Sequence, residues 1–93
     1  MPVGLLKIEL YLPCCNSLKE KRKYLNSIKG RLKSRLNVAV SELEHQDLWQ
    51  RSVMGVVAIS SSGQVVERIL QKTLEEIERT IPGEVISTHR EVI

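Results

Sequence analysis

Eight of the fourteen lysine and arginine residues lie between Lys19 and Arg35, beside a single acid, Glu20. This stretch, the basic segment, carries a net charge of +7. In the rest of the chain ten acids outnumber six cations, which leaves −4, so the overall charge of +3 conceals a strong separation. A dense row of cations attracts polyanions, and nucleic-acid phosphates in particular. The chemistry that the segment offers is therefore electrostatic binding.

The basic segment has the spacing of an amphipathic helix. It opens on Ser17-Leu18-Lys19-Glu20, a capping-box pattern in which the Ser17 hydroxyl accepts a hydrogen bond from the Glu20 N–H. One apolar stripe then recurs at steps of seven, three, four and four residues, formed by Leu18, Leu25, Ile28, Leu32 and Leu36. The cations therefore form a ridge on a folded helix.

The basic side chains flank this stripe and are the predicted contacts to phosphate. We expect a non-enzymatic protein that binds structured RNA or a ribosomal particle through Lys19, Arg22, Lys23, Lys29, Arg31, Lys33 and Arg35. The alternative is a solvated helix face whose lysine stems cover the edge of the core. An ordinary solvated face mixes both charges, whereas this one does not.

Aromatic residues are too few for base reading by a sheet. The chain has Tyr11, Tyr24 and Trp49 and no phenylalanine, and its expected central strands carry no aromatic side chain that would stack bases. We therefore expect recognition of RNA shape and charge rather than of single-stranded sequence.

An acidic cluster near the middle of the chain offers metal-ligand chemistry as an alternative. Its members are Glu42, Glu44, His45 and Asp47. Strand alternation places Glu42 and Glu44 on one face and His45 on the other, so we expect no metal site and no cofactor.

Trp49 and Arg51 are candidates for a protein interface, because both residue types are enriched in binding hot spots. The alternative is a tryptophan that caps the end of the core. The outward face of the first strand presents Val3, Leu5 and Tyr11, which favours a homodimer through an open sheet face. This protein–protein module is the alternative to RNA binding.

Enzymatic chemistry has little support in the sequence. Cys14 or Cys15 with His45 or His89 would make a nucleophile pair, but nothing in the sequence brings them together. Adjacent cysteines rarely pair, so both are expected to be reduced. Acylphosphatases have this size and fold, but their phosphate loop needs an arginine that residues 13–17 lack. We therefore expect that this protein is not an enzyme.

The order of elements predicts the fold. Strands are expected over Val3–Leu12, Val38–Glu44, Gln50–Ser60 and Val85–Ile93, with helices after Ser17 and over Gln64–Thr80. A βαββαβ order gives a ferredoxin-like α+β sandwich, with four antiparallel strands and two helices on one face. All 93 residues form a single domain.

No segment approaches the roughly 20 apolar residues that span a membrane, and Lys7 and Glu9 interrupt the early apolar run. We therefore expect a cytoplasmic protein with no membrane partner.

Three blocks of the chain resemble the YlxP-like family of small bacterial proteins. They are the residues 17–22 (SLKEKR), 37–42 (NVAVSE) and 45–51 (HQDLWQR). The resemblance covers essentially the whole chain and implies a ferredoxin-like fold and a cytosolic bacterial protein. Genes of that family often lie among those for translation initiation and ribosome maturation, which implies a role linked to the ribosome. The family supplies no agreed catalytic residues.

Overall fold

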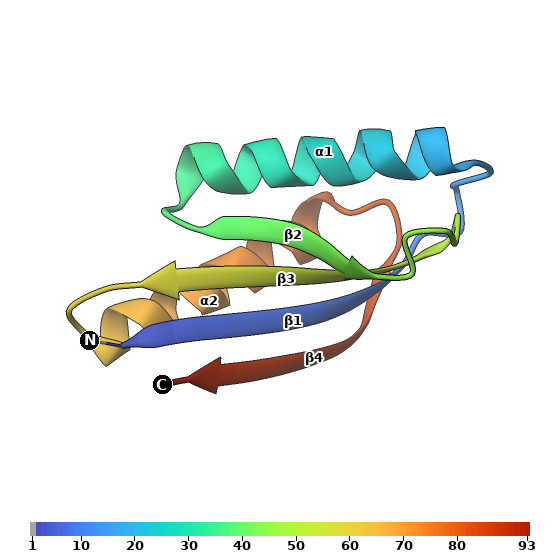
Figure 1. The fold of residues 1–93 in the computed structure, drawn as a ribbon. Coiled ribbons are helices and arrows are strands. Elements are labelled where there is room, and N and C mark those ends of the chain that lie inside the picture. The colour runs from blue at the N-terminus through green and yellow to red at the C-terminus, as the bar shows by residue number, and fades with distance from the viewer. Residues whose placement is uncertain (1) are drawn as a thin grey trace.

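The computed structural model describes residues 2–93 and has the predicted order of elements. These are β1 (Val3–Tyr11), α1 (Leu18–Arg35), β2 (Ala39–Glu44), β3 (Arg51–Ile59), α2 (Gly63–Thr80) and β4 (Glu84–Val92). The strands form one antiparallel sheet in the order β2-β3-β1-β4. Both helices lie on one face of this sheet, and the other face is open (Figure 1). The predicted ferredoxin-like α+β fold is confirmed.

Strand β1 pairs with β3 on one side and β4 on the other, and its two faces differ. Leu6, Ile8 and Leu10 are buried under the helices, whereas Leu5 and Lys7 are half-buried on the open face. Gly4 lies directly under α2, where an added Cβ would come within 2.4 Å of Val66 Cγ1. A side chain at this position would push the helix away from the sheet.

Helix α1 begins as its capping box predicts. The Ser17 hydroxyl accepts from the Glu20 N–H at 3.1 Å. Leu25, Ile28 and Leu32 are buried in the core, and the helix lies over β2 and beside α2. The uncovered side of α1 therefore faces away from the sheet.

A β-bulge at Leu43 changes the direction of side chains at the end of β2. Glu42 pairs with Met54 and Glu44 pairs with Val53, so two successive register positions of β3 oppose three residues of β2. Glu42 consequently faces the helices while Glu44 faces the open side of the sheet. Within residues 2–93, neither helix is apolar enough over a sufficient length to span a bilayer.

Candidate nucleic-acid interface

The seven predicted phosphate contacts all lie on α1, but the structure divides them into two groups. Arg31 and Arg35 face α2, where Nε of Arg31 lies 3.9 Å and Nη1 of Arg35 lies 3.5 Å from Oε1 of Glu76. Arg79 also pairs with Glu76 and, as the main cause, holds the pKa of that carboxyl below its ordinary range. These two arginines therefore serve the contact between the helices.

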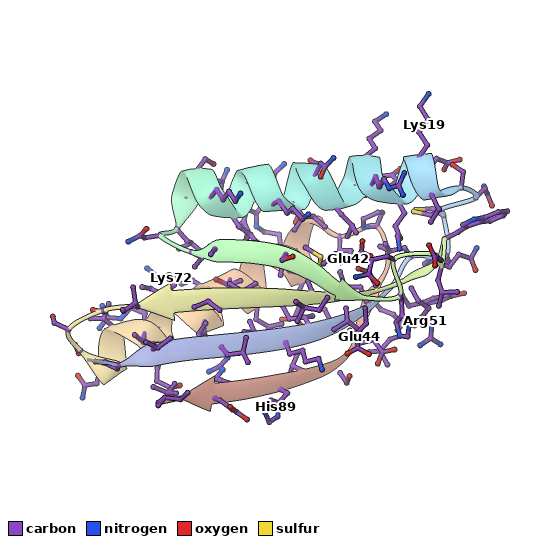
Figure 2. All side chains as sticks on the ribbon, viewed as in Figure 1. Lys19, Glu42, Glu44, Arg51, Lys72 and His89 are labelled. Carbon is purple, nitrogen blue, oxygen red and sulfur yellow. The ribbon has the colours of Figure 1, made fainter. Side chains whose placement is uncertain are left out.

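The other five cations have no ion-pair partner among residues 2–93. We call them the basic ridge, and they are Lys19, Arg22, Lys23, Lys29 and Lys33. Four are exposed, and Lys29 is half-buried. Figure 2 shows Lys19 at the start of α1, directed away from the sheet. The ridge therefore presents positive charge to the solvent along the length of the helix.

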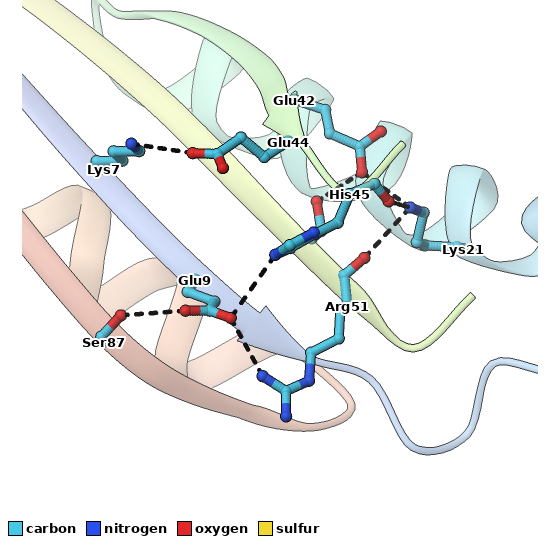
Figure 3. Close-up of polar contacts among 9 residues, drawn as sticks. Lys7, Glu9, Lys21, Glu42, Glu44, His45, Arg51 and Ser87 are labelled. Carbon is cyan, nitrogen blue, oxygen red and sulfur yellow. Dashed lines mark hydrogen bonds and ion pairs between the residues drawn. The ribbon is translucent and has the colours of Figure 1, made fainter. Parts of the chain in front are cut away.

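The eighth cation of the basic segment, Lys21, is fully buried. Its ammonium lies 2.9 Å from Oε2 of Glu42 and donates to the backbone carbonyls of His45, at 2.7 Å, and Arg51, at 3.3 Å (Figure 3). A weaker contact reaches the Gln46 carbonyl at 3.4 Å. Lys21 therefore fastens the segment between β2 and β3 to the first turns of α1, and it takes no part in the exposed ridge.

Sequence reasoning missed the role of Lys21, although a signal was present. The apolar stripe jumps seven residues from Leu18 to Leu25, and Lys21 occupies the helical turn between them. A cation in phase with a buried stripe indicates an internal partner, here the carboxylate of Glu42.

The acidic cluster at the hairpin does not come together. The prediction that Glu42 and Glu44 share one face is wrong, because the bulge at Leu43 turns them to opposite faces. Glu42 pairs with Lys21 and accepts from the Ser52 hydroxyl, whereas Glu44 pairs with Lys7 at 3.0 Å. No group of three or more His, Cys, Asp or Glu side chains in residues 2–93 is arranged to hold a metal ion.

The two residues proposed as an interface anchor lie in different surroundings. Trp49 is 54% exposed and does not cap the core, so that alternative is excluded. The Arg51 guanidinium pairs with Glu9 at 3.1 Å and lies 5.6 Å from the ring centroid of Tyr11 on the open sheet face. The side chain of Arg51 is therefore held by neighbours, whereas that of Trp49 is available.

The cysteines and histidines do not form a nucleophile pair. Cys14 is exposed and Cys15 is buried in the core, where burial and the neighbouring Cys14 raise the pKa of Cys15 to about 11. His45 lies beside Glu9, at 3.9 Å, and His89 lies beside Glu91, at 2.8 Å. Within the part of the chain that the structure describes, neither histidine contacts a thiol.

The open face of the sheet has an apolar half and a polar half. Leu43, Val57 and Ile59 are 40–49% exposed, and the first two line an apolar hollow of about 180 Å³ with Leu5. The polar half holds Lys7, Glu9, Glu44, His45, Arg51 and Ser87, most of them in ion pairs or hydrogen bonds (Figure 3).

Fold and surface together define a small ferredoxin-like protein with a basic outer helix. Residues 3–90 match the model of a protein family of unknown function, DUF503. The chain is also 41% identical over 85 residues to the uncharacterized protein YlxP of Bacillus subtilis, covering 85% of this chain and 92% of that protein. The chain therefore belongs to the YlxP-like DUF503 family.

Two solved structures share the fold. The designed protein Ferredog-Diesel has 20% identity and a TM-score of 0.52, over 96% of this chain and 83% of its own. A variant of SnoaB, a cofactor-independent oxygenase from Streptomyces nogalater, has 10% identity and a TM-score of 0.51, over 99% and 90%. At these identities the likeness concerns the fold alone.

Proposed function

We propose that this protein is a non-enzymatic accessory factor that binds structured RNA or a ribosomal particle through α1, in ribosome maturation or translation. The observation that carries the proposal is the basic ridge, because it places on one helix five cations that have no acidic partner among residues 2–93. The helix fixes the positions from which these cations leave the backbone, so only their side chains need to be ordered when phosphates bind.

The exposed surface of α2 can be compared with that of α1 for its mixture of charges. Helix α2 alternates Glu67 and Arg68, and Lys72 with Glu75, so acids accompany its cations. Like charges at neighbouring helical positions cost a few tenths of a kcal/mol per pair, and α1 bears this cost along its exposed side. A phosphate ligand would relieve the repulsion.

The composition of the sheet supports shape-based recognition. On the open face, the central strand β3 presents Val53, Gly55 and Val57. The expectation that the central strands carry no aromatic side chain is wrong for Tyr11 of β1, but its ring lies under the Arg51 guanidinium. Base stacking on central strands is the mode that the sheet does not support. The connection to the ribosome rests on the gene neighbourhood that the family resemblance implies.

The test is fluorescence anisotropy of a labelled, structured ribosomal RNA fragment, titrated with the protein at three salt concentrations. We expect log Kd to rise with log salt with a slope of about 3 to 5, as three to five neutralised phosphates require. Absence of binding at low salt would overturn the proposal and leave the ridge as a charged surface.

A second candidate function is a protein–protein module that uses the open sheet face. The exposed side chains of Leu43, Val57 and Ile59 around an apolar hollow favour it, because contiguous apolar surface marks interaction sites. Arg51 and Trp49 would extend that surface toward the hairpin. Light scattering at tens of micromolar distinguishes the homodimer from the 10.6 kDa monomer, and a monomeric mass would count against self-association.

A further inference from the structure

Trp49 is an exposed aromatic side chain that the RNA-binding proposal does not yet use. With Asp47, Leu48, Gln50 and Arg51 it lines a shallow, open hollow of about 400 Å³. The neighbouring Leu48 is 46% exposed, so part of the lining is an apolar side chain open to solvent. An indole in this state provides a flat surface on which another aromatic ring can stack.

The segment that carries Trp49 is fastened on both sides. On one side, Lys21 holds the carbonyls of His45 and Gln46, and His45 adopts a left-handed backbone with φ of 65°. On the other, the Gln50 side-chain amide donates to the carbonyls of Pro13 at 3.1 Å and Cys15 at 3.3 Å. The indole is therefore presented by a pre-formed loop, which lowers the ordering cost of binding.

The same contacts place this loop beside the start of the basic ridge. Lys21 faces the loop from the inner side of α1. Lys19, Arg22 and Lys23 lie within about one helical turn of it along the chain, exposed on the outer side of the helix. Figure 1 shows the connection between β2 and β3 at the end of the molecule where α1 begins. Asp47 lines the hollow and disfavours a phosphate there, and Arg51, which also lines it, is already paired with Glu9. We therefore expect the phosphates at the cations of α1.

We propose that Trp49 stacks on one unpaired base of a folded RNA whose neighbouring phosphates contact Lys19, Arg22 and Lys23. The ligand class is a helical stem interrupted or ended by an unpaired nucleotide. This inference rests on the proposed function and adds to it the local structure of the RNA. A flat aromatic surface tolerates any base, so the site selects an unpaired nucleotide rather than a sequence.

The experiment compares two RNA hairpins of identical stem, one fully paired and one with a single bulged nucleotide in the stem. Trp49 is the only tryptophan, so its intrinsic fluorescence reports stacking directly. We expect the bulged RNA to quench this fluorescence and the paired RNA to leave it nearly unchanged. Trp49→Ala should weaken binding of the bulged RNA by roughly 5- to 150-fold, with no change for the paired RNA.

Two controls keep this test specific. Trp49→Phe should retain most of the affinity because phenylalanine also stacks. Ile86→Ala, at an exposed apolar residue of β4 outside the hollow, should leave it unchanged. Equal effects of Trp49→Ala on both RNAs, or none, would overturn the stacking inference while salt-dependent binding continued to support the ridge. A wild-type homodimer that Trp49→Ala converts to a monomer would assign the indole to a second copy and also overturn it. Failure of both RNAs to bind at low salt would overturn the proposed function itself.

Discussion

The ammonium of Lys21 lies 2.9 Å from the carboxylate of Glu42, in a site where the lysine is fully buried and the glutamate side chain is 15% exposed. This pair joins α1 to the inner face of β2. The ammonium also donates to three backbone carbonyls. All of these contacts, which offset the cost of burying the charge, are made to the β2–β3 hairpin. One cation of the basic segment thus has a role inside the fold.

Removal of the buried ammonium should destabilise the fold strongly. Lys21→Ala removes the ammonium from three carbonyls and leaves the Glu42 carboxylate with the Ser52 hydroxyl but no cation. Loss of one partner of a buried pair costs about 3–5 kcal/mol. Urea unfolding measures this change in the free energy of unfolding. The matched control is Lys23→Ala, an exposed cation two residues away, which should change it by less than about 0.5 kcal/mol. Similar small effects of both variants would contradict the buried pair.

The pairing of Glu76 with three arginines should make stability depend on acidic pH. Because the folded-state pKa of Glu76 lies below the ordinary value of 4.5, its stabilising effect is present above that pH and is lost as pH falls through the lowered value. Glu76→Gln removes the effect at every pH. The free energy of unfolding of this variant should therefore lie furthest below that of the native protein at neutral pH, and the gap should shrink below about pH 4.

The control for Glu76 is Glu78→Gln, at an exposed position of the same helix. Its difference from the native protein should vary less with pH. Urea unfolding at pH 7, 5 and 3 provides the comparison, and a constant gap for Glu76→Gln would contradict the ion-pair assignment.

The two adjacent cysteines should differ in reactivity. Cys14 is exposed, whereas Cys15 is buried with a pKa of about 11, so little of its thiolate exists at pH 8. In native protein, a thiol reagent such as DTNB should modify Cys14 rapidly in the Cys15→Ser variant. In the Cys14→Ser variant the reaction should be slow until denaturant is added. Comparable native rates in the two variants would contradict the burial of Cys15.

The fold could be predicted from the sequence because its signals are local. The alternation of Leu6, Ile8 and Leu10, and the Ser17 cap, determine elements that the structure reproduces within one or two residues. The side of the sheet on which each hairpin side chain lies could not be predicted in the same way. Strict alternation places Glu42 with Glu44, and the bulge at Leu43 depends on how β2 pairs with β3, a long-range effect that the pattern does not show.

The candidate site was predictable only in part for a related reason. Sequence spacing identified both flanks of α1, but which flank is neutralised depends on where Glu76 of α2 packs. The division of the seven cations into the basic ridge and the two arginines that contact α2 therefore depends on tertiary packing, which spacing along the sequence does not show.

Binding of RNA phosphates by the basic ridge can be tested by comparing two charge-matched double variants. Lys29→Ala with Lys33→Ala removes two ridge cations at helical spacing, and Arg68→Ala with Lys72→Ala removes two exposed cations at the same spacing from α2. Both lower the net charge equally. Anisotropy of a structured RNA across a salt series should show weaker binding, and a salt slope lower by up to about two, for the α1 pair alone. Equal effects of the two pairs would mean that net charge, not the ridge, attracts the RNA, and unchanged affinity in the α1 pair would contradict the account.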